Sequence, residues 1–184
     1  TTNANSGVNG AWTWAQVLST AAAGQRVNAL KGSYSLGNGN DTPTNAGTAI
    51  APIWLRGFDT TIGDIDTDNT LTKPSLAWGT GRFIPKNYWL LSNLDMSGAN
   101  TNATFDAGAA LGSRVDRCRI ANSSTGYAVD TFAGGDLAIT RSWLNNTSTG
   151  TVLRARAPVR LAGCTLKGGS TGLSITTTSL VPVT

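Results

Sequence analysis

Short alternations of apolar and polar residues recur at regular intervals along the second half of the chain. The tripeptide Ser-Thr-Gly occurs at residues 124–126, 148–150 and 170–172. An alternating stretch follows each copy, and the stretches that precede the copies are residues 115–120, 139–144 and 161–166. Since alternate residues of a strand face opposite sides of a sheet, each stretch predicts a short strand. Short strands and turns that return about every 20 to 25 residues are typical of a solenoid.

Stacking of successive rungs places equivalent residues of the repeat in columns. With Leu94 and Met96 facing the core, adding the repeat length gives three inward columns: Leu94, Cys118, Ser142 and Cys164; Met96, Ile120, Leu144 and Leu166; and Phe105, Val129, Leu153 and Ile175. The outward columns are Asp59, Asp95, Arg119, Trp143 and Thr165; and Ser92, Asp116, Thr140 and Ala162. Four residues are predicted at the bend between two strands: Asn93, Arg117, Arg141 and Gly163. We expect any binding site on the outward columns, because the inward columns fill a dry core.

The first part of the chain predicts a cap for this core. Residues 12–23 carry apolar side chains at helical spacing, and Gly24 follows as a stop signal. Residues 26–36 then alternate as a strand that bends at Gly32. A short amphipathic helix at the start of a solenoid would cover its open end.

The sequence of residues 3–36 resembles the opening of pectate-lyase-like right-handed parallel β-helix proteins. In that family an Asn/Ser/Gly loop leads to a cap helix, an Ala-Ala-Ala-Gly-x-x-Val motif, a strand and a Gly-x-Tyr corner. This layout is matched by Ala21–Gly24, Val27, Gly32 and Tyr34. Residues 51–74 are similar to a segment of uncharacterised β-helix proteins of bacteria and phages. The resemblance implies an all-β, single-stranded right-handed parallel β-helix with a short N-terminal capping helix. It implies no single function, because this fold carries lyases, hydrolases, adhesins and phage spikes.

Composition favours a folded, strand-rich chain without a nucleic-acid or membrane partner. At 184 residues and 40% apolar content, we expect one domain, residues 1–184, with a loop and cap helix at 1–24 and rungs at 25–184. All ten acidic residues are Asp, which suits turns better than helices. The net charge of +4 comes without a cationic run, and no apolar span is long enough to cross a bilayer. The chain starts at Thr1 without Met or a signal peptide, so we expect that a segment precedes it or was removed.

The two cysteines are predicted to be free. Cys118 and Cys164 have the same inward register two rungs apart. Strands of neighbouring rungs lie about 4.8 Å apart, so two rungs separate the residues by roughly 9.6 Å. A disulfide needs Cα atoms within about 7 Å of each other. We therefore expect two buried thiols that fill space in the core.

One group of outward residues has the chemistry of a glycan-binding surface. The group comprises Asp95, Asp116, Arg117, Arg119, Arg141 and Trp143. An indole ring can stack on a sugar, and guanidinium groups pair with carboxylates or sulfates. The same residues could instead form a ladder of long side chains that covers the solenoid, or a contact between subunits. The sequence leaves these alternatives open.

A run of aspartates in the longest irregular segment between rungs, residues 59–74, resembles the start of a calcium loop. These aspartates are Asp64, Asp66 and Asp68. However, Asn69 stands where an EF-hand loop has Gly, and Ser75 stands where it has the bidentate Glu. Asx turns are the simpler explanation. A Ca²⁺ site remains one alternative, and no other cofactor is expected.

Catalysis is not the leading hypothesis. The chain has no histidine, which is the most frequent general base and a common metal ligand. Pectate-lyase chemistry would need carboxylates around Ca²⁺ and an Arg or Lys base. The residue types are present in Asp95, Asp116, Arg117 and Arg141, but no lyase motif accompanies them. Paired-Asp glycosidase chemistry needs a carboxyl spacing that the sequence does not fix.

We therefore predict a non-catalytic structural or adhesion module of a phage virion or another extracellular assembly, with surface glycans as ligand. Such a module is expected to associate as a trimer, as a filament stacked end to end, or with other virion proteins. A polysaccharide lyase or glycoside hydrolase is the first alternative, and a self-assembling filament subunit is the second.

Overall fold

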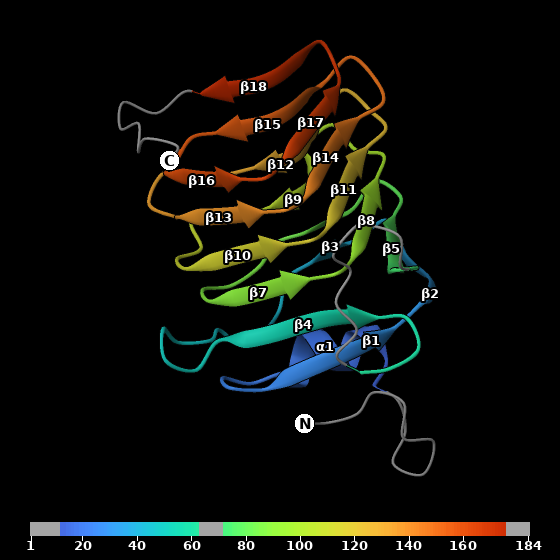
Figure 1. Cartoon of the computed structure of the whole chain (residues 1–184), viewed down its shortest axis with the longest axis vertical. Helices are drawn as coiled ribbons and strands as arrows, with labels where there is room; N and C mark the ends of the chain where they lie inside the picture. The colour runs from blue at the N-terminus through green and yellow to red at the C-terminus, as the bar shows by residue number, and fades with distance from the viewer. Residues whose placement is uncertain (1–11, 63–71, 176–184) are drawn as a thin grey trace.

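The computed structural model describes residues 12–62 and 72–175, which form a parallel β-helix of six rungs (Figure 1). Each rung gives one strand to each of three parallel sheets. Sheet A contains β1 (Arg26–Leu30), β4 (Ile53–Phe58), β7 (Trp89–Ser92), β10 (Ser113–Asp116), β13 (Leu137–Thr140) and β16 (Val159–Ala162). Sheet B contains β2 (Gly32–Gly37), β5 (Pro74–Trp78), β8 (Asp95–Gly98), β11 (Arg119–Asn122), β14 (Trp143–Asn146) and β17 (Thr165–Gly168). Sheet C contains β3 (Asn40–Asp41), β6 (Arg82–Phe83), β9 (Ala103–Asp106), β12 (Tyr127–Asp130), β15 (Thr151–Ala155) and β18 (Thr171–Ile175).

Strand register confirms the repeat and the predicted fold class. One inward column of sheet B contains, in order, Met96, Ile120, Leu144 and Leu166. The inward column of sheet C contains Phe105, Val129 and Leu153. Side chains of the inner rungs in these columns are fully buried, so like residues stack on like residues along one continuous core. The protein is an all-β, right-handed parallel β-helix with a short N-terminal helix.

Asp59 does not belong to the outward column of sheet B, contrary to the prediction. Asp95 pairs with Ser75 in the preceding rung, while Phe58 ends β4 in sheet A. The chain leaves the rung after Phe58 and re-enters sheet B at β5, and Asp59 forms an ion pair with Lys31. A fixed repeat length therefore fails across the inserted segment.

Ile175 does not stack on Leu153 in the inward column of sheet C, contrary to the prediction. Leu153 pairs with Leu173, because the turn that leads into β18 is shorter than the turn that leads into β15. The third Ser-Thr-Gly copy consequently lies later relative to its strand than the first two copies do. Leu173 and Ile175 are 42% and 46% exposed, since within the described residues no further rung covers them.

The helix α1 (Trp14–Thr20) covers the N-terminal end of the core, as predicted, although it is shorter than residues 12–23. Thr13 and Gln16 form a capping box, in which each side chain accepts a hydrogen bond from the other residue's backbone N–H. The indole N–H groups of Trp14 and Trp78 both donate to Asp41 Oδ2, at 2.7 and 2.6 Å, and so tie the helix to the first rungs. No helix in the described part of the chain has the length and apolar character needed to span a membrane.

Candidate functional site

The bend between sheets A and B places two arginines in neighbouring rungs. The bend residues Asn93, Arg117, Arg141 and Gly163 all have positive φ angles, of 58°, 52°, 48° and 62°. This left-handed conformation costs a residue with a side chain about 1–2 kcal/mol, and such residues cluster at functional sites. Hydrogen bonds between rungs hold the bend, for example from the Arg117 N–H to the Thr140 carbonyl at 3.0 Å. The predicted position of these residues at the bend is confirmed.

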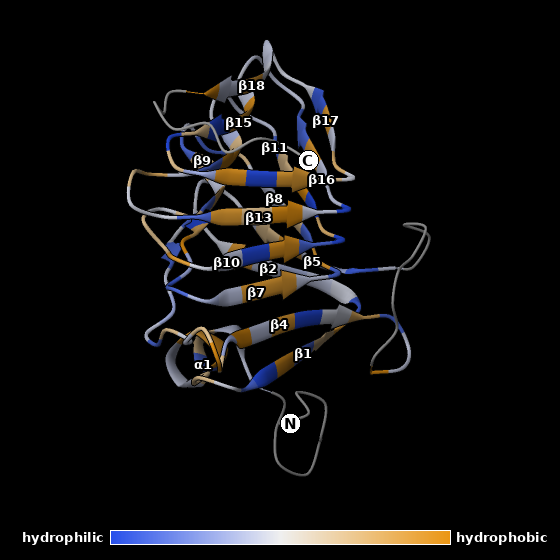
Figure 2. Cartoon of the chain, turned by 60° about the vertical axis from the view of Figure 1, so that its left-hand side comes forward, coloured by the Kyte–Doolittle hydropathy of each residue, from blue (hydrophilic) through white to orange (hydrophobic). Residues whose placement is uncertain are grey.

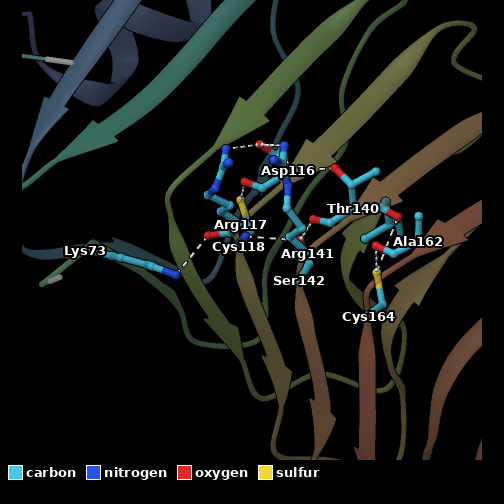
Figure 3. A network of polar contacts seen from close by, with 10 residues as sticks. Lys73, Asp116, Arg117, Cys118, Thr140, Arg141, Ser142, Ala162 and Cys164 are labelled. Carbon is cyan, nitrogen blue, oxygen red and sulfur yellow. Dashed lines mark hydrogen bonds and ion pairs between the residues drawn. The ribbon is translucent and has the colours of Figure 1, made fainter. Parts of the chain in front are cut away.

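Asp116 joins the two arginines into one cluster at the end of β10 (Figure 3). Arg141 donates from Nε to Asp116 Oδ1 at 2.8 Å and from Nη2 to Oδ2 at 2.7 Å. Arg117 donates from Nη1 to Oδ2 at 2.7 Å, and the Thr140 hydroxyl donates to Oδ1 at 2.6 Å. Both carboxylate oxygens are therefore occupied, while the Arg141 side chain is 57% exposed. The cluster presents positive charge to solvent rather than a free carboxylate.

The remaining predicted site residues lie on the outward face of sheet B. Asp95, Arg119 and Trp143 are stacked in register. Arg119 Nη1 lies 3.3 Å from Asp95 Oδ2, and its guanidinium carbon lies 5.3 Å from the centre of the Trp143 ring. Lys167 Nζ lies 5.8 Å from the same ring centre. Two cations thus already lie over this indole. The six predicted residues form two groups, one at the bend and one on sheet B.

A groove of about 670 Å³ lies over the outward face of sheet A, and we call it the sheet A groove. Its charged lining residues are Arg56, Arg114, Arg117, Arg141, Arg160, Asp116 and Asp136. Asp136 accepts a hydrogen bond from the Gly112 N–H, so both groove carboxylates have a donor. With Arg56 set aside, four arginines and two aspartates line this groove, which leaves a surplus of positive charge. Apolar floor is supplied by Trp54, Leu90, Ala138 and Pro158.

The arginines and the tryptophan of the groove that are absent from the predicted site are Trp54, Arg56, Arg114 and Arg160. Two of them, Arg114 and Arg160, could have been found from the repeat. Adding the repeat length to Leu90 gives Arg114 and Ala138, and Ala138 pairs with Arg160 across a shortened turn. Trp54 and Arg56 precede the inserted segment after β4, so counting along the repeat does not reach them.

Arg154 and Arg156 belong to a separate cluster around the buried Asp130 of sheet C. Arg154 donates from Nε and Nη2 to the two Asp130 carboxylate oxygens at 2.9 and 2.5 Å, and Arg156 Nη2 donates to Oδ2 at 2.6 Å. The Asp130 side chain is only 4% exposed. Hydrogen bonding to Asp130 raises the pKa of Arg154. These arginines therefore compensate a buried carboxylate and contribute no charge to the sheet A groove.

Both cysteines are free, as predicted. Burial raises the pKa of the Cys118 thiol to about 12, so this group stays protonated and unreactive at neutral pH. Cys164 is only partly buried, which corrects the prediction of two buried thiols. Its exposure follows from its place in the last described rung.

The predicted calcium ligands Asp64, Asp66 and Asp68 lie outside the described residues. Within residues 12–62 and 72–175, no three His, Cys, Asp or Glu side chains are grouped so that they could hold a metal ion. The calcium hypothesis therefore stays a prediction.

A known structure shares this fold. It is a polysaccharide lyase of family 6, described as specific for mannuronic acid and derived from the human gut microbiota. The TM-score is 0.57 at 12% sequence identity, over 90% of this chain and 49% of the lyase chain. The protein thus spans about half the length of that enzyme. No protein-family model and no curated protein sequence matches the chain. The likeness shows a pectate-lyase-like parallel β-helix and extends to the fold alone.

Proposed function

We propose that the protein is a non-catalytic adhesion module that binds an acidic polysaccharide in the sheet A groove. The observation that carries this proposal is the groove's charge: Arg114 and Arg160 are exposed there, and the described residues give neither of them an acidic partner. Guanidinium groups bind carboxylates and sulfates through paired N–H donors. A polymer that carries such groups along its length would neutralise the surplus charge.

The apolar floor of the groove fits a sugar chain as well. Trp54 and Leu90 are paired neighbours on the outward face of sheet A, and both are only partly buried. Carbohydrate rings present C–H faces that pack against aromatic and aliphatic side chains, while their hydroxyl and acidic groups need polar partners. The groove offers both kinds of surface within one volume.

The chemistry of the lining favours binding over catalysis. Of the described residues that line the groove, none is Lys, Tyr or His. Its two carboxylates already accept hydrogen bonds, Asp116 from two arginines and a threonine and Asp136 from a backbone N–H. A proton abstraction would therefore rest on an arginine, whose side chain keeps its proton at neutral pH.

Titration calorimetry with mannuronate oligosaccharides tests the proposal, with neutral 1,4-linked β-glucan oligosaccharides as the comparison. We expect binding of the acidic series only, weakened by added salt because exposed charges are screened. Arg114→Ala and Arg160→Ala should each lower the affinity about tenfold, the equivalent of about 1.4 kcal/mol. Arg119→Ala is the matched control, since Arg119 is an exposed arginine on sheet B outside the groove. Equal binding of both sugar series, or loss of binding only in Arg119→Ala, would contradict the proposal.

A polysaccharide lyase is the second candidate, favoured by the fold shared with the family 6 lyase and by Arg117 and Arg141 beside Asp116 in the groove. Lyase action on alginate or polygalacturonate, with and without calcium, gives an unsaturated product that absorbs ultraviolet light. If the wild type forms product steadily and Arg141→Ala does not, the function is catalysis rather than binding.

We further propose that the module works in a phage virion or another extracellular assembly, where a rigid solenoid displays the groove. The exposed apolar Leu173 and Ile175 in the last described rung support an assembly partner at that end. Light-scattering mass measurement separates the alternatives. A defined oligomer such as a trimer supports a spike-like module, a growing mass distribution supports a filament, and a strict monomer at high concentration removes self-association.

A further inference from the structure

The outward column of sheet A carries its positive charge on every second rung in its last three strands. Arg114 in β10 pairs with Ala138 in β13, and Ala138 pairs with Arg160 in β16. Figure 2 shows hydrophilic bands in the middle of β10 and β16 and none in the middle of β13 between them. Both arginines are exposed, and the alanine between them has no polar side-chain atom that could contact a ligand.

The spacing of the strands gives the distance between the two arginines. Neighbouring strands lie about 4.8 Å apart, so the Cα atoms of Arg114 and Arg160 are separated by roughly 9.6 Å along the solenoid axis. An extended 1,4-linked sugar chain advances by about one rung spacing per residue. In a flat chain with twofold screw symmetry, successive sugars face opposite sides and alternate sugars face the same side. Acidic groups on sugars i and i+2 therefore recur at the separation of the two arginines.

We propose that Arg114 and Arg160 read the carboxylates of alternate sugars in an extended polyuronate chain that lies parallel to the solenoid axis. The carboxylate of the intervening sugar points away from Ala138 and makes no contact with the protein there. The preferred ligand class is then any extended acidic glycan with a carboxylate on every second sugar, whether or not the sugar between is acidic. This inference rests on the proposed function of the groove and adds the spacing and direction of its ligand.

Bend residues do not supply the missing charge in the middle rung. Arg141 follows β13 but is paired with Asp116 through two hydrogen bonds, and Arg117 is paired with the same carboxylate. The Asp116 carboxylate cancels one of the two positive charges of Arg117 and Arg141. Both arginines also lie beyond the strand ends rather than in the Arg114 column.

The test uses mannuronate oligosaccharides of defined length and measures affinity by titration calorimetry. We expect a step of about tenfold or more between the disaccharide and the trisaccharide, because only the trisaccharide has carboxylates on sugars i and i+2. The step should disappear in Arg114→Ala and in Arg160→Ala, and it should persist in the control Arg119→Ala.

Selective reduction of one carboxylate to an alcohol in the trisaccharide gives the sharper result. Reduction of the central carboxylate should leave the affinity within about twofold, whereas reduction of the first or third should remove the step. If central and terminal reductions cost the same, the spacing inference is wrong while the acidic-glycan function stands. If no mannuronate oligosaccharide binds at all, the proposed function itself fails.

Discussion

At the scale of residues, the charged side chains divide according to the sheet that carries them. Over sheet A, Arg114 and Arg160 are exposed, whereas Arg117 and Arg141 share the Asp116 carboxylate. These four arginines give the groove its positive surplus. On sheet C, Asp106 and Asp130 are buried; Asp106 pairs with Arg82, and Asp130 pairs with Arg154 and Arg156. The charges over sheet A suit the binding of an external anion, while the charges on sheet C are satisfied within the fold.

Asp106 makes the stability of the protein depend on pH. Burial raises the pKa of its carboxyl group above 3.8, although the Arg82 guanidinium at 2.8 Å opposes the shift. The folded state therefore favours the protonated acid. Its stabilising contribution is complete below the pKa of the unfolded chain and is lost as the pH rises through the raised pKa.

We expect Asp106→Asn to remove this dependence. The free energy of unfolding of the wild type, minus that of the variant, should fall as the pH rises from about 4 to about 7. Urea unfolding of both proteins across this range measures the difference. A difference that grows with pH would show that the Arg82 ion pair outweighs burial.

At the scale of elements, the strands are held by their columns rather than by intrinsic preference. Strands such as β11 have only four residues, yet Ile120 is completely buried between Met96 and Leu144. Each inner rung is covered on both sides, while the last described rung has a neighbour on one side only. The same substitution should therefore cost less at the end of a column than in its middle.

Ile120→Ala and Leu166→Ala test this gradient within one column. We expect Ile120→Ala to lower the free energy of unfolding by about 2–5 kcal/mol, the usual range for a large core side chain. Leu166 is partly exposed in the last described rung, so Leu166→Ala should cost roughly half as much or less. Urea unfolding monitored by circular dichroism gives both values. Equal costs would mean that the last rung is as well covered as the inner ones.

The repeat made most of the architecture predictable, because register in a solenoid follows from sequence spacing. It placed Arg117 and Arg141 at the bend and Met96, Ile120 and Leu144 in one column. It failed for Asp59 and Ile175, where an insertion and a shortened turn changed the spacing.

The groove was only partly predictable from sequence. Arg117, Arg141 and Asp116 were among the predicted residues, whereas Trp54 and Arg114 were not. The positions of arginines in the sequence do not show which of them are available to bind a ligand and which pair with an aspartate of the protein. Arg154 and Arg160 look alike in sequence, but Arg154 binds a buried aspartate and Arg160 faces the groove.

At the scale of the whole molecule, the solenoid is a rigid support with three outward faces that differ in character. Sheet A carries the arginine-lined groove, sheet B carries the Arg119–Trp143 stack, and sheet C carries the ion pairs of the buried aspartates. The cap α1 covers one end of the core and does not extend over sheet A (Figure 2). A linear polymer can therefore lie along sheet A without a change of fold.

A crystal structure of the protein with a mannuronate tetrasaccharide tests the central claim most directly. The account predicts a sugar chain over sheet A, parallel to the solenoid axis, with carboxylates of alternate sugars on Arg114 and Arg160 and a ring face against the apolar floor. A chain bound on sheet B at Trp143, or a chain across the strands' ends that leaves both arginines empty, would contradict it.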